Sequence, residues 1–157
     1  MADKETTSFM RSLCMGRIEQ DVLFPFPTVS EAEKETLSDI AGALEGLLGP
    51  RAEDFRKWDV AGELPGEFID ELKEFGMFGL VIPEDSGGMG LGNMAYSRTL
   101  QEVGRFDASV AVTIGAHSSI GMRGLLLFGT DEQKNRYLPK LAMPPLVIHS
   151  LLPLSSQ

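Results

Sequence analysis

The chain is 157 residues long, 43% hydrophobic and 24% charged, which is typical of one soluble domain with a buried core. Its formal net charge of −9 argues against nucleic acid and anionic membranes as partners, because no basic face is available to neutralise phosphates. Cys14 is the only cysteine and His117 and His149 are the only histidines, so neither an internal disulfide nor a metal site is expected. No secretory signal or bilayer-length apolar run is visible, and we expect a cytoplasmic location.

Residues 1–29 are predicted to form an extension ahead of the helical part of the chain. A short amphipathic helix is expected within it over residues 6–16, with three apolar side chains on one side: Phe9, Met10 and Leu13. The following LFPFP segment (23–27) is predicted to be non-helical, because a residue before proline is pushed toward extended geometry. We expect its two phenylalanines to act as a strap that pins the N-terminus.

A long helix is predicted to begin at Ser30, because Glu33 three residues later completes a capping box. Apolar residues then recur at helical spacing: Leu37, Ile40, Ala41, Leu44, Leu47 and Leu48. Gly49-Pro50 is expected to break or kink this helix, with a helical continuation through Phe55 and Trp58.

Pro65 suits the first position of the next predicted helix, which Gly76 ends. One face of this helix is apolar: Phe68, Ile69, Leu72 and Phe75. The glycine-rich segment 77–92 fits neither a phosphate loop nor a dinucleotide fingerprint, so a tight connection between helices is favoured. A helix from about Asn93 to Val103 follows, with three side chains turned inward: Met94, Leu100 and Val103.

Residues 107–129 are predicted to form one central helix that Asp107 caps. Its middle contains Gly115, Gly121 and Gly124, although each glycine costs roughly 1 kcal/mol in a helix relative to alanine. Something is therefore expected to approach the backbone closely. Packing against a neighbouring helix is the plainer interpretation, and an apolar ligand groove is the alternative. Periodicity alone does not separate them.

A last helix is predicted to begin at Thr130, where Gln133 completes a second capping box. Its expected buried side is formed by Tyr137, Leu138 and Leu141. The sequence thus predicts an all-α fold, a bundle of five to six helices. No catalytic constellation is present, and His117, which has no acid or nucleophile partner in the pattern, is expected to be a packed or hydrogen-bonded histidine.

Taken together, three segments resemble the N-terminal helical domain of the acyl-CoA dehydrogenase family. They are ELKEFGMFGL (71–80) running on to Pro83-Glu84 and Gly87–Gly90, then TIGAHSSIG (113–121), and then GTDEQK (129–134) closed by YLPKL (137–141). The FPFP segment (24–27) and the GAHSSIG run resemble the very-long-chain branch. The resemblance covers about residues 9–142 and marks residues 30–142 as the helical domain.

The resemblance implies a function. Family members oxidise an acyl-CoA thioester to the trans-2-enoyl-CoA, with FAD as hydride acceptor and a glutamate as base, and they pass electrons to electron-transfer flavoprotein. The N-terminal helices wall the acyl and flavin cavity. By this resemblance Thr113, Ala116 and Ile120 contact the acyl chain, and the small Gly115 and Ala116 leave room for a long-chain acyl-CoA. Full-length relatives are usually homo-oligomers.

The resemblance stops after Ala142, and residues 143–157 form a tail that does not match. The family continues with a middle β-domain that binds the flavin and a C-terminal domain that supplies the base. We therefore expect a chain truncated before the β-domain, through a shortened or frame-shifted gene. Such a chain would lack dehydrogenase activity, and its uncovered apolar surface would cause aggregation or dependence on a partner. The alternative is a non-enzymatic helical module that binds acyl chains or a protein partner.

Overall fold

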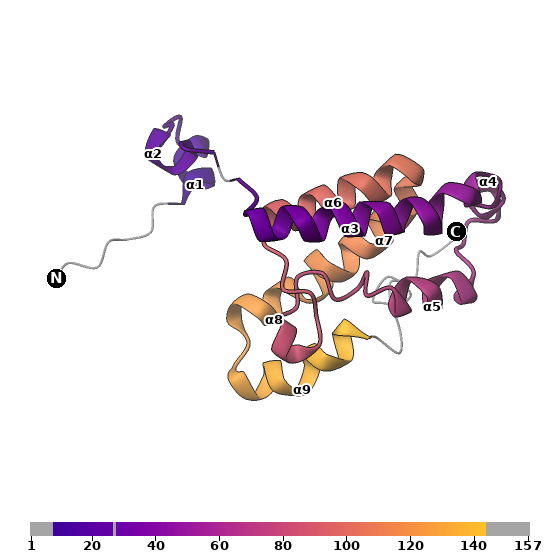
Figure 1. The fold of residues 1–157 in the computed structure, drawn as a ribbon. Helices are drawn as coiled ribbons and strands as arrows, with labels where there is room; N and C mark the ends of the chain where they lie inside the picture. The colour runs from indigo at the N-terminus through magenta and orange to yellow at the C-terminus, as the bar shows by residue number, and fades with distance from the viewer. Residues whose placement is uncertain (1–7, 27, 144–157) are drawn as a thin grey trace, which may run out of the picture.

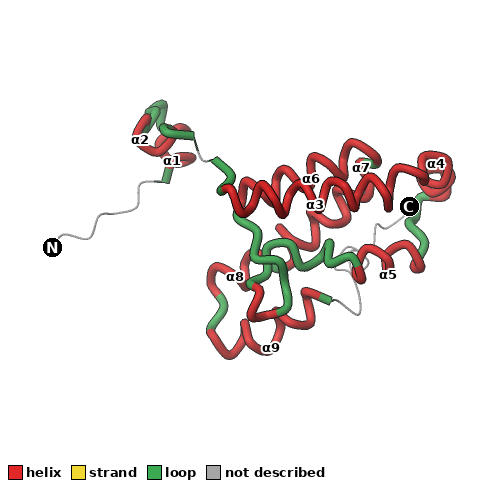
Figure 2. The backbone as a smooth tube through the Cα atoms, viewed as in Figure 1, coloured by secondary structure: helices red, strands yellow, loops and turns green. Residues whose placement is uncertain are grey.

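The computed structural model describes residues 8–26 and 28–143, and every regular element in them is helical (Figures 1 and 2). Six helices have nine or more residues: α3 (Glu31–Leu48), α4 (Ala52–Ala61), α5 (Gly66–Glu74), α6 (Asn93–Phe106), α7 (Ala108–Ala116) and α9 (Asp131–Ala142). The shorter elements are α1 (Phe9–Cys14), α2 (Gln20–Leu23), α8 (Arg123–Phe128), the 3₁₀ turns η1 (Gly49–Arg51) and η2 (Glu84–Ser86), and the π-helical η3 (His117–Gly121). The predicted all-α bundle is confirmed.

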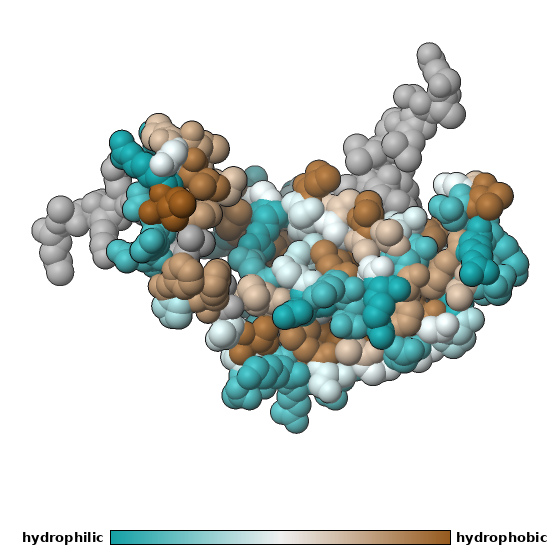
Figure 3. Space-filling view, turned by 90° about the horizontal axis from the view of Figure 1, so that it is seen from above, coloured by the Kyte–Doolittle hydropathy of each residue, from teal (hydrophilic) through white to brown (hydrophobic). Residues whose placement is uncertain are grey.

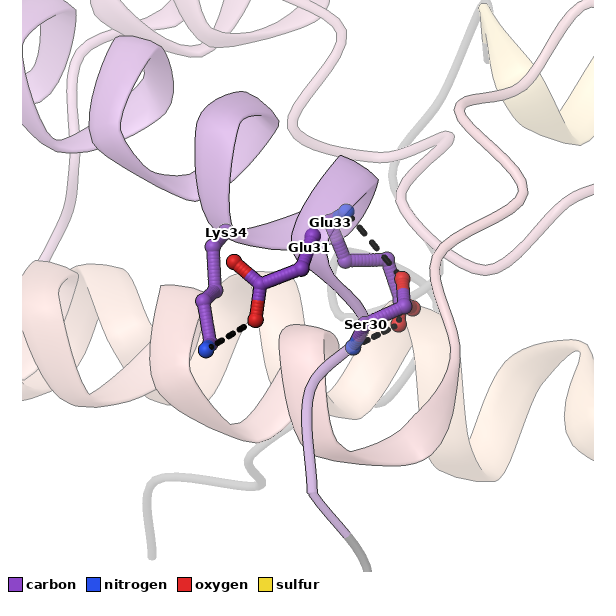
Figure 4. A network of polar contacts seen from close by, with 4 residues as sticks. All are labelled: Ser30, Glu31, Glu33 and Lys34. Carbon is purple, nitrogen blue, oxygen red and sulfur yellow. Dashed lines mark hydrogen bonds and ion pairs between the residues drawn. The ribbon is translucent and has the colours of Figure 1, made fainter.

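The start of α3 is fixed by the predicted capping box (Figure 4). The Glu33 N–H donates to Ser30 Oγ and the Ser30 N–H donates to Glu33 Oε2, both over 3.2 Å. The other oxygen, Glu33 Oε1, accepts from the Gly92 N–H over 3.1 Å. The bonds from Ser30, followed by the bond from Gly92, lower the pKa of Glu33. One carboxylate therefore stabilises the start of α3 and ties it to the start of α6.

The main core lies where α3 and α6 run side by side, with α7 packed against α6 (Figure 1). Its buried apolar residues come from every long helix except α9 and from the loop between α5 and α6: Ile40, Leu44, Leu48, Phe55, Phe68, Ile69, Leu72, Met77, Phe78, Leu80, Leu91, Ala95, Val103, Val110 and Ile114. Full burial of one large apolar side chain contributes about 1.5–3 kcal/mol. A second cluster joins α9 to the loop after α5: Ile82, Met122, Leu138 and Ala142.

The glycine-rich loop between α5 and α6 is the tight connection that the sequence favours. Its main chain folds back on itself through bonds from Met89 N–H to the Gly79 carbonyl (3.0 Å) and from Leu91 N–H to the Leu80 carbonyl (2.8 Å). A Cβ at Gly88 would lie 2.2 Å from the Ile82 carbonyl oxygen, so only glycine fits there. These amides already have partners within the loop, and the loop positions the buried Phe78 against His117 of η3.

The expected strap at the N-terminus is not a strap in the described residues. Leu23 is the last residue of the short helix α2, so the segment begins in a helix, and Phe24 has the extended geometry that the following proline imposes. Phe24 and Phe26 stack edge to face with ring centres 4.7 Å apart, yet 57% and 64% of their surfaces are exposed. Apolar residues gather on this segment, which stands away from the bundle (Figures 1 and 3). The prediction of pinning by phenylalanines is therefore wrong, and Pro27 lies outside the described residues.

Three further expectations need correction. Helix α1 forms as predicted, but its expected apolar side is uncovered, since Met10 and Leu13 are exposed. Pro65 is not the first residue of α5 but the N-cap residue before it, with a non-helical ψ of 143°. Tyr137 is exposed, and Ala142 is buried with Leu138 instead. Residues 144–157, including His149 and most of the predicted tail, lie outside the described residues.

Candidate functional site

The predicted central helix is divided into three parts. Asp107 caps α7 as expected, with its Oδ1 accepting from the Val110 N–H over 2.9 Å. The chain then winds into the π-helical η3 and resumes as α8 after Met122. A π turn closes i→i+5 hydrogen bonds and so holds about one extra residue. The residues after Ala116 are therefore rotated relative to a continuous α-helix, and a stripe predicted from α-helical spacing does not stay on one face.

Thr113 and Gly115, two of the predicted substrate contacts, face the body of the protein. Thr113 is buried, and its Oγ1 donates to the Ser109 carbonyl over 2.8 Å. It lines a cavity of about 190 Å³ shared with Phe55 and Trp58. A Cβ at Gly115 would lie 3.6 Å from Leu100 Cδ1 of α6. At Gly115 the close neighbour of the central helix is thus another helix.

The other two predicted contacts lie on the outer side of the same segment. Ala116 is half-buried, whereas 75% of the Ile120 surface is exposed. Val112, four residues before Ala116, is 68% exposed. We call Val112, Ala116 and Ile120 the apolar strip. Sequence reasoning missed Val112 as a site residue, although its spacing of four from Ala116 could have indicated it.

Two further apolar side chains at the end of α8, Leu127 and Phe128, are also exposed. Gly124, between the strip and this end, has no atom within 4 Å of the place where a Cβ would lie. The described part of the central segment therefore carries several exposed apolar side chains in addition to the strip. Isolated exposed apolar residues are ordinary, but several along one segment indicate a ligand or a protein interface.

His117 fixes η3 from the inner side. Its ring is fully buried against Phe78, with ring centres 5.1 Å apart, and its Nε2 donates to the Leu141 carbonyl over 2.9 Å. Burial lowers the pKa of His117, and the bond to Leu141 opposes part of that effect. The expected packed, hydrogen-bonded histidine is confirmed. Its role in the described residues is to join η3 to α9.

The chemistry available along the strip is limited to apolar contact. Among the described residues, no group of three or more metal-ligating side chains occurs.

One described segment, Ala108–Phe128, is long and apolar enough to cross a membrane by length and composition alone. Its Val110 and Ile114 belong to the main core, which accounts for part of that apolar character.

A comparison with protein-family models decides the family: the acyl-CoA dehydrogenase N-terminal domain matches residues 30–143. The chain belongs to the acyl-CoA dehydrogenase family. Human mitochondrial very long-chain specific acyl-CoA dehydrogenase is 40% identical over 147 residues, covering 90% of this chain and 22% of the relative. The chain thus spans about a fifth of the length of the curated relatives that it matches.

Solved acyl-CoA dehydrogenases share this helical fold. Butyryl-CoA dehydrogenase from Megasphaera elsdenii superposes with a TM-score of 0.59 at 28% identity, covering 74% of this chain and 30% of that one. An acyl-CoA dehydrogenase from Bacillus anthracis, complexed with FAD, gives the same TM-score and identity over 84% of this chain and 23% of that one. The likeness is therefore one of both fold and sequence.

Proposed function

We propose that this chain forms the N-terminal helical domain of an FAD-dependent acyl-CoA dehydrogenase that acts on long-chain acyl-CoA. In this proposal the domain walls one side of the acyl and flavin cavity. The observation that carries it is the apolar strip, because Val112 and Ile120 are exposed while the opposite side of the same segment is buried in the core. Val112 and Ile120 are eight residues apart, which corresponds to about 12 Å along a helix.

The small side chain of Ala116, in the middle of the strip, supports the proposal that the substrate has a long acyl chain. Ala116 carries only a methyl group, so the wall between Val112 and Ile120 is shallow there. A cavity gains depth when side-chain volume is removed from its wall. In this proposal Thr113 and Gly115 do not contact the acyl chain and instead support the strip from its buried side. Thr113 hydrogen-bonds within α7, and Gly115 leaves room for Leu100 of α6.

The described residues do not form a flavin site by themselves. The strip offers no hydrogen-bond donor, and several amides of the glycine-rich loop are already bonded to carbonyls of the same loop. We therefore propose that FAD and the catalytic glutamate are held by parts of the enzyme other than this helical domain, and that the isolated chain does not oxidise acyl-CoA.

A chimera tests the proposal. Residues 30–142 of this chain replace the matching residues of human very long-chain specific acyl-CoA dehydrogenase, and kcat/KM is measured for acyl-CoA substrates of increasing chain length. We expect a flavin-containing enzyme that prefers long chains. An enzyme that folds and binds flavin but acts only on short chains would contradict the long-chain assignment. The unmodified human enzyme is the control.

Binding and activity assays on the isolated chain distinguish the proposed enzyme domain from the alternative, a non-enzymatic binding module. We expect neither bleaching of added FAD with long-chain acyl-CoA nor tight acyl-CoA binding. Tight acyl-CoA binding without flavin would favour an independent binding module. Electron-transfer flavoprotein as acceptor and a homo-oligomeric enzyme remain predictions for the complete protein. The cytoplasmic location also remains a prediction, and the mammalian relatives are named as mitochondrial.

A further inference from the structure

The N-terminal arm, by which we mean residues 8–26, stands away from the helical bundle (Figures 1 and 3). It contains the short helices α1 and α2. Six of its large apolar side chains are 44% to 64% exposed: Met10, Leu13, Met15, Ile18, Phe24 and Phe26. Single exposed apolar residues are ordinary, but so many on one short segment indicate an interaction surface.

The centre of the arm is polar. Ser12 is buried, and its Oγ donates to Glu19 Oε1 over 3.2 Å. The Arg17 N–H donates to the Ser12 carbonyl over 2.9 Å. These bonds give the arm a defined local fold that has a polar contact inside and apolar side chains outside. That is the reverse of the arrangement expected for a segment that buries its own core.

The composition of the arm favours a protein partner. Phenylalanine and methionine, which the arm exposes, are enriched at the centres of protein interfaces. Binding to an anionic membrane surface instead uses an excess of lysine and arginine. The arm has no such excess, because its two basic residues are balanced by two acidic ones: Arg11, Arg17, Glu19 and Asp21.

The comparisons indicate which protein carries the partner surface. The family model begins at residue 30 and leaves the arm out. The match to the human very long-chain enzyme covers 90% of this chain, which the residues from 30 onward could not supply even if the match ran to residue 157. Part of the first 29 residues is therefore shared with that relative. This chain corresponds to only 22% of the relative, so most of that enzyme lies outside the matched part.

We propose that the N-terminal arm docks into an apolar groove on the part of the complete dehydrogenase that follows the N-terminal helical domain. This inference rests on the proposed function, since it places the domain within a longer enzyme. Phe24 and Phe26, whose ring centres are 4.7 Å apart, form the anchor. Docking covers the apolar side chains of the arm and braces the helical domain against the rest of the enzyme.

Cys14 provides the test, because it is the only cysteine of the chain and is exposed. It follows Met10 by four residues, so it lies on the same face of α1. Alkylation of Cys14 by N-ethylmaleimide therefore reports whether this face is covered. Peptide mass spectrometry gives the alkylation rate in the isolated full chain and in a chimera, in which residues 8–142 replace the matching residues of the human enzyme.

We expect the chimera to react at least about tenfold more slowly, because a docked arm exposes Cys14 only when it opens. Phe24→Ser combined with Phe26→Ser should restore the rate of the isolated chain. Val60→Ser is the matched control, since Val60 of α4 is also exposed but lies outside the arm. A second chimera, which takes only residues 8–29 from this chain, keeps the human helical domain and gives the same readout if the larger chimera does not fold.

Equal alkylation rates in the isolated chain and the chimera would overturn the proposal. Protection of Cys14 in the isolated chain would overturn it too. Such protection would indicate a second copy as the partner if it increased with protein concentration, and the chain's own bundle if it did not. Flavin content and kcat/KM of the same chimera test the proposed function separately. An active long-chain enzyme with a freely reacting Cys14 would retain the function and refute the docking.

Discussion

The His117 side chain donates from Nε2 to the Leu141 carbonyl, and so joins η3 to the last turn of α9. The last four carbonyls of a helix have no partner within it, and His117 satisfies one of those in α9. Because Nε2 carries the proton, Nδ1 is left bare and buried, without a partner among the described residues. The bond thus determines the tautomer of the ring and fastens η3 to α9.

Replacing His117 by phenylalanine should destabilise the protein by about 1–3 kcal/mol, because the Leu141 carbonyl loses its donor in a buried place. The ring still packs against Phe78, so the loss reports on the hydrogen bond more than on packing. Urea unfolding of both proteins measures the difference. His117→Gln retains a donor and should recover part of the loss. Equal stability of wild type and His117→Phe would show that the bond contributes little.

Stability should fall as pH decreases from about 6.5, the ordinary pKa of histidine. Burial lowers the pKa of His117 in the folded state, so the unfolded chain binds its proton first as the pH falls. The slope is at most about 1.4 kcal/mol per pH unit and ends at the folded pKa, with no contribution from this group above 6.5. Urea midpoints between pH 7.5 and 5 measure it, and His117→Gln should remove this part of the slope.

A second loss of stability is expected at more acid pH. The pKa of Glu33 is lowered from its ordinary value of 4.5 by the bonds from Ser30 and Gly92. Its contribution is present above about pH 4.5 and is lost as the pH falls toward the folded pKa. Glu33→Gln should flatten the pH dependence of urea midpoints between pH 4.5 and 3 and leave the window near pH 6 unchanged. An unchanged acid slope in this variant would contradict the assignment.

Gly88→Ala should destabilise the protein by about 3 kcal/mol, because the new Cβ would collide with the Ile82 carbonyl inside the folded loop. Gly46→Ala in α3 is the matched control, since no atom lies within 4 Å of its added Cβ. That control should stabilise α3 by up to about 1 kcal/mol. Thermal unfolding of the two variants compares them directly. Similar melting temperatures of the two variants would contradict the prediction, because they would mean that the loop adjusts to the added Cβ at little cost in stability.

Ala116→Leu should shorten the acyl chains that the chimeric dehydrogenase accepts. The added side chain fills the shallow middle of the apolar strip, so kcat/KM should drop tenfold or more for the longest substrates, corresponding to about 1.4 kcal/mol of transition-state binding. Short substrates should be affected less than twofold. Gly42→Leu adds more bulk on α3, where nothing lies within 4 Å, and should leave the chain-length profile unchanged. A uniform loss over all chain lengths would argue against the acyl groove.

Local signals predicted much of the fold. Both capping boxes depend on residues three apart, Ser30 with Glu33 and Thr130 with Gln133, and both form as predicted. Gly76 ends α5 because its φ of 76° is strained for any other residue. The apolar faces of α3 and α5 follow from helical spacing. Such features need only neighbouring residues, so one sequence is enough to find them.

Features that depend on distant partners were not predictable in this way. The π turn at His117–Gly121 accompanies a bond from His117 to Leu141, 24 residues away. It separates the buried Thr113 from the exposed Ile120, which α-helical spacing would place on one face. Phe24 and Phe26 have a strongly apolar pattern, yet the described residues provide nothing that covers them. The pattern of a segment gives its preference for burial and does not identify the surface that buries it.

The Glu33 carboxylate, described above as a cap, also sets how far α3 and α6 are displaced along each other. It bonds at once to Ser30 and to the Gly92 N–H, 59 residues later in the chain. A slip of either helix by one turn would move these groups apart by about 5.4 Å and break one of the two bonds. The ion pair between Arg105 of α6 and Glu45 of α3 acts in the same direction, so polar contacts at both ends of the pair hold the two helices in one alignment.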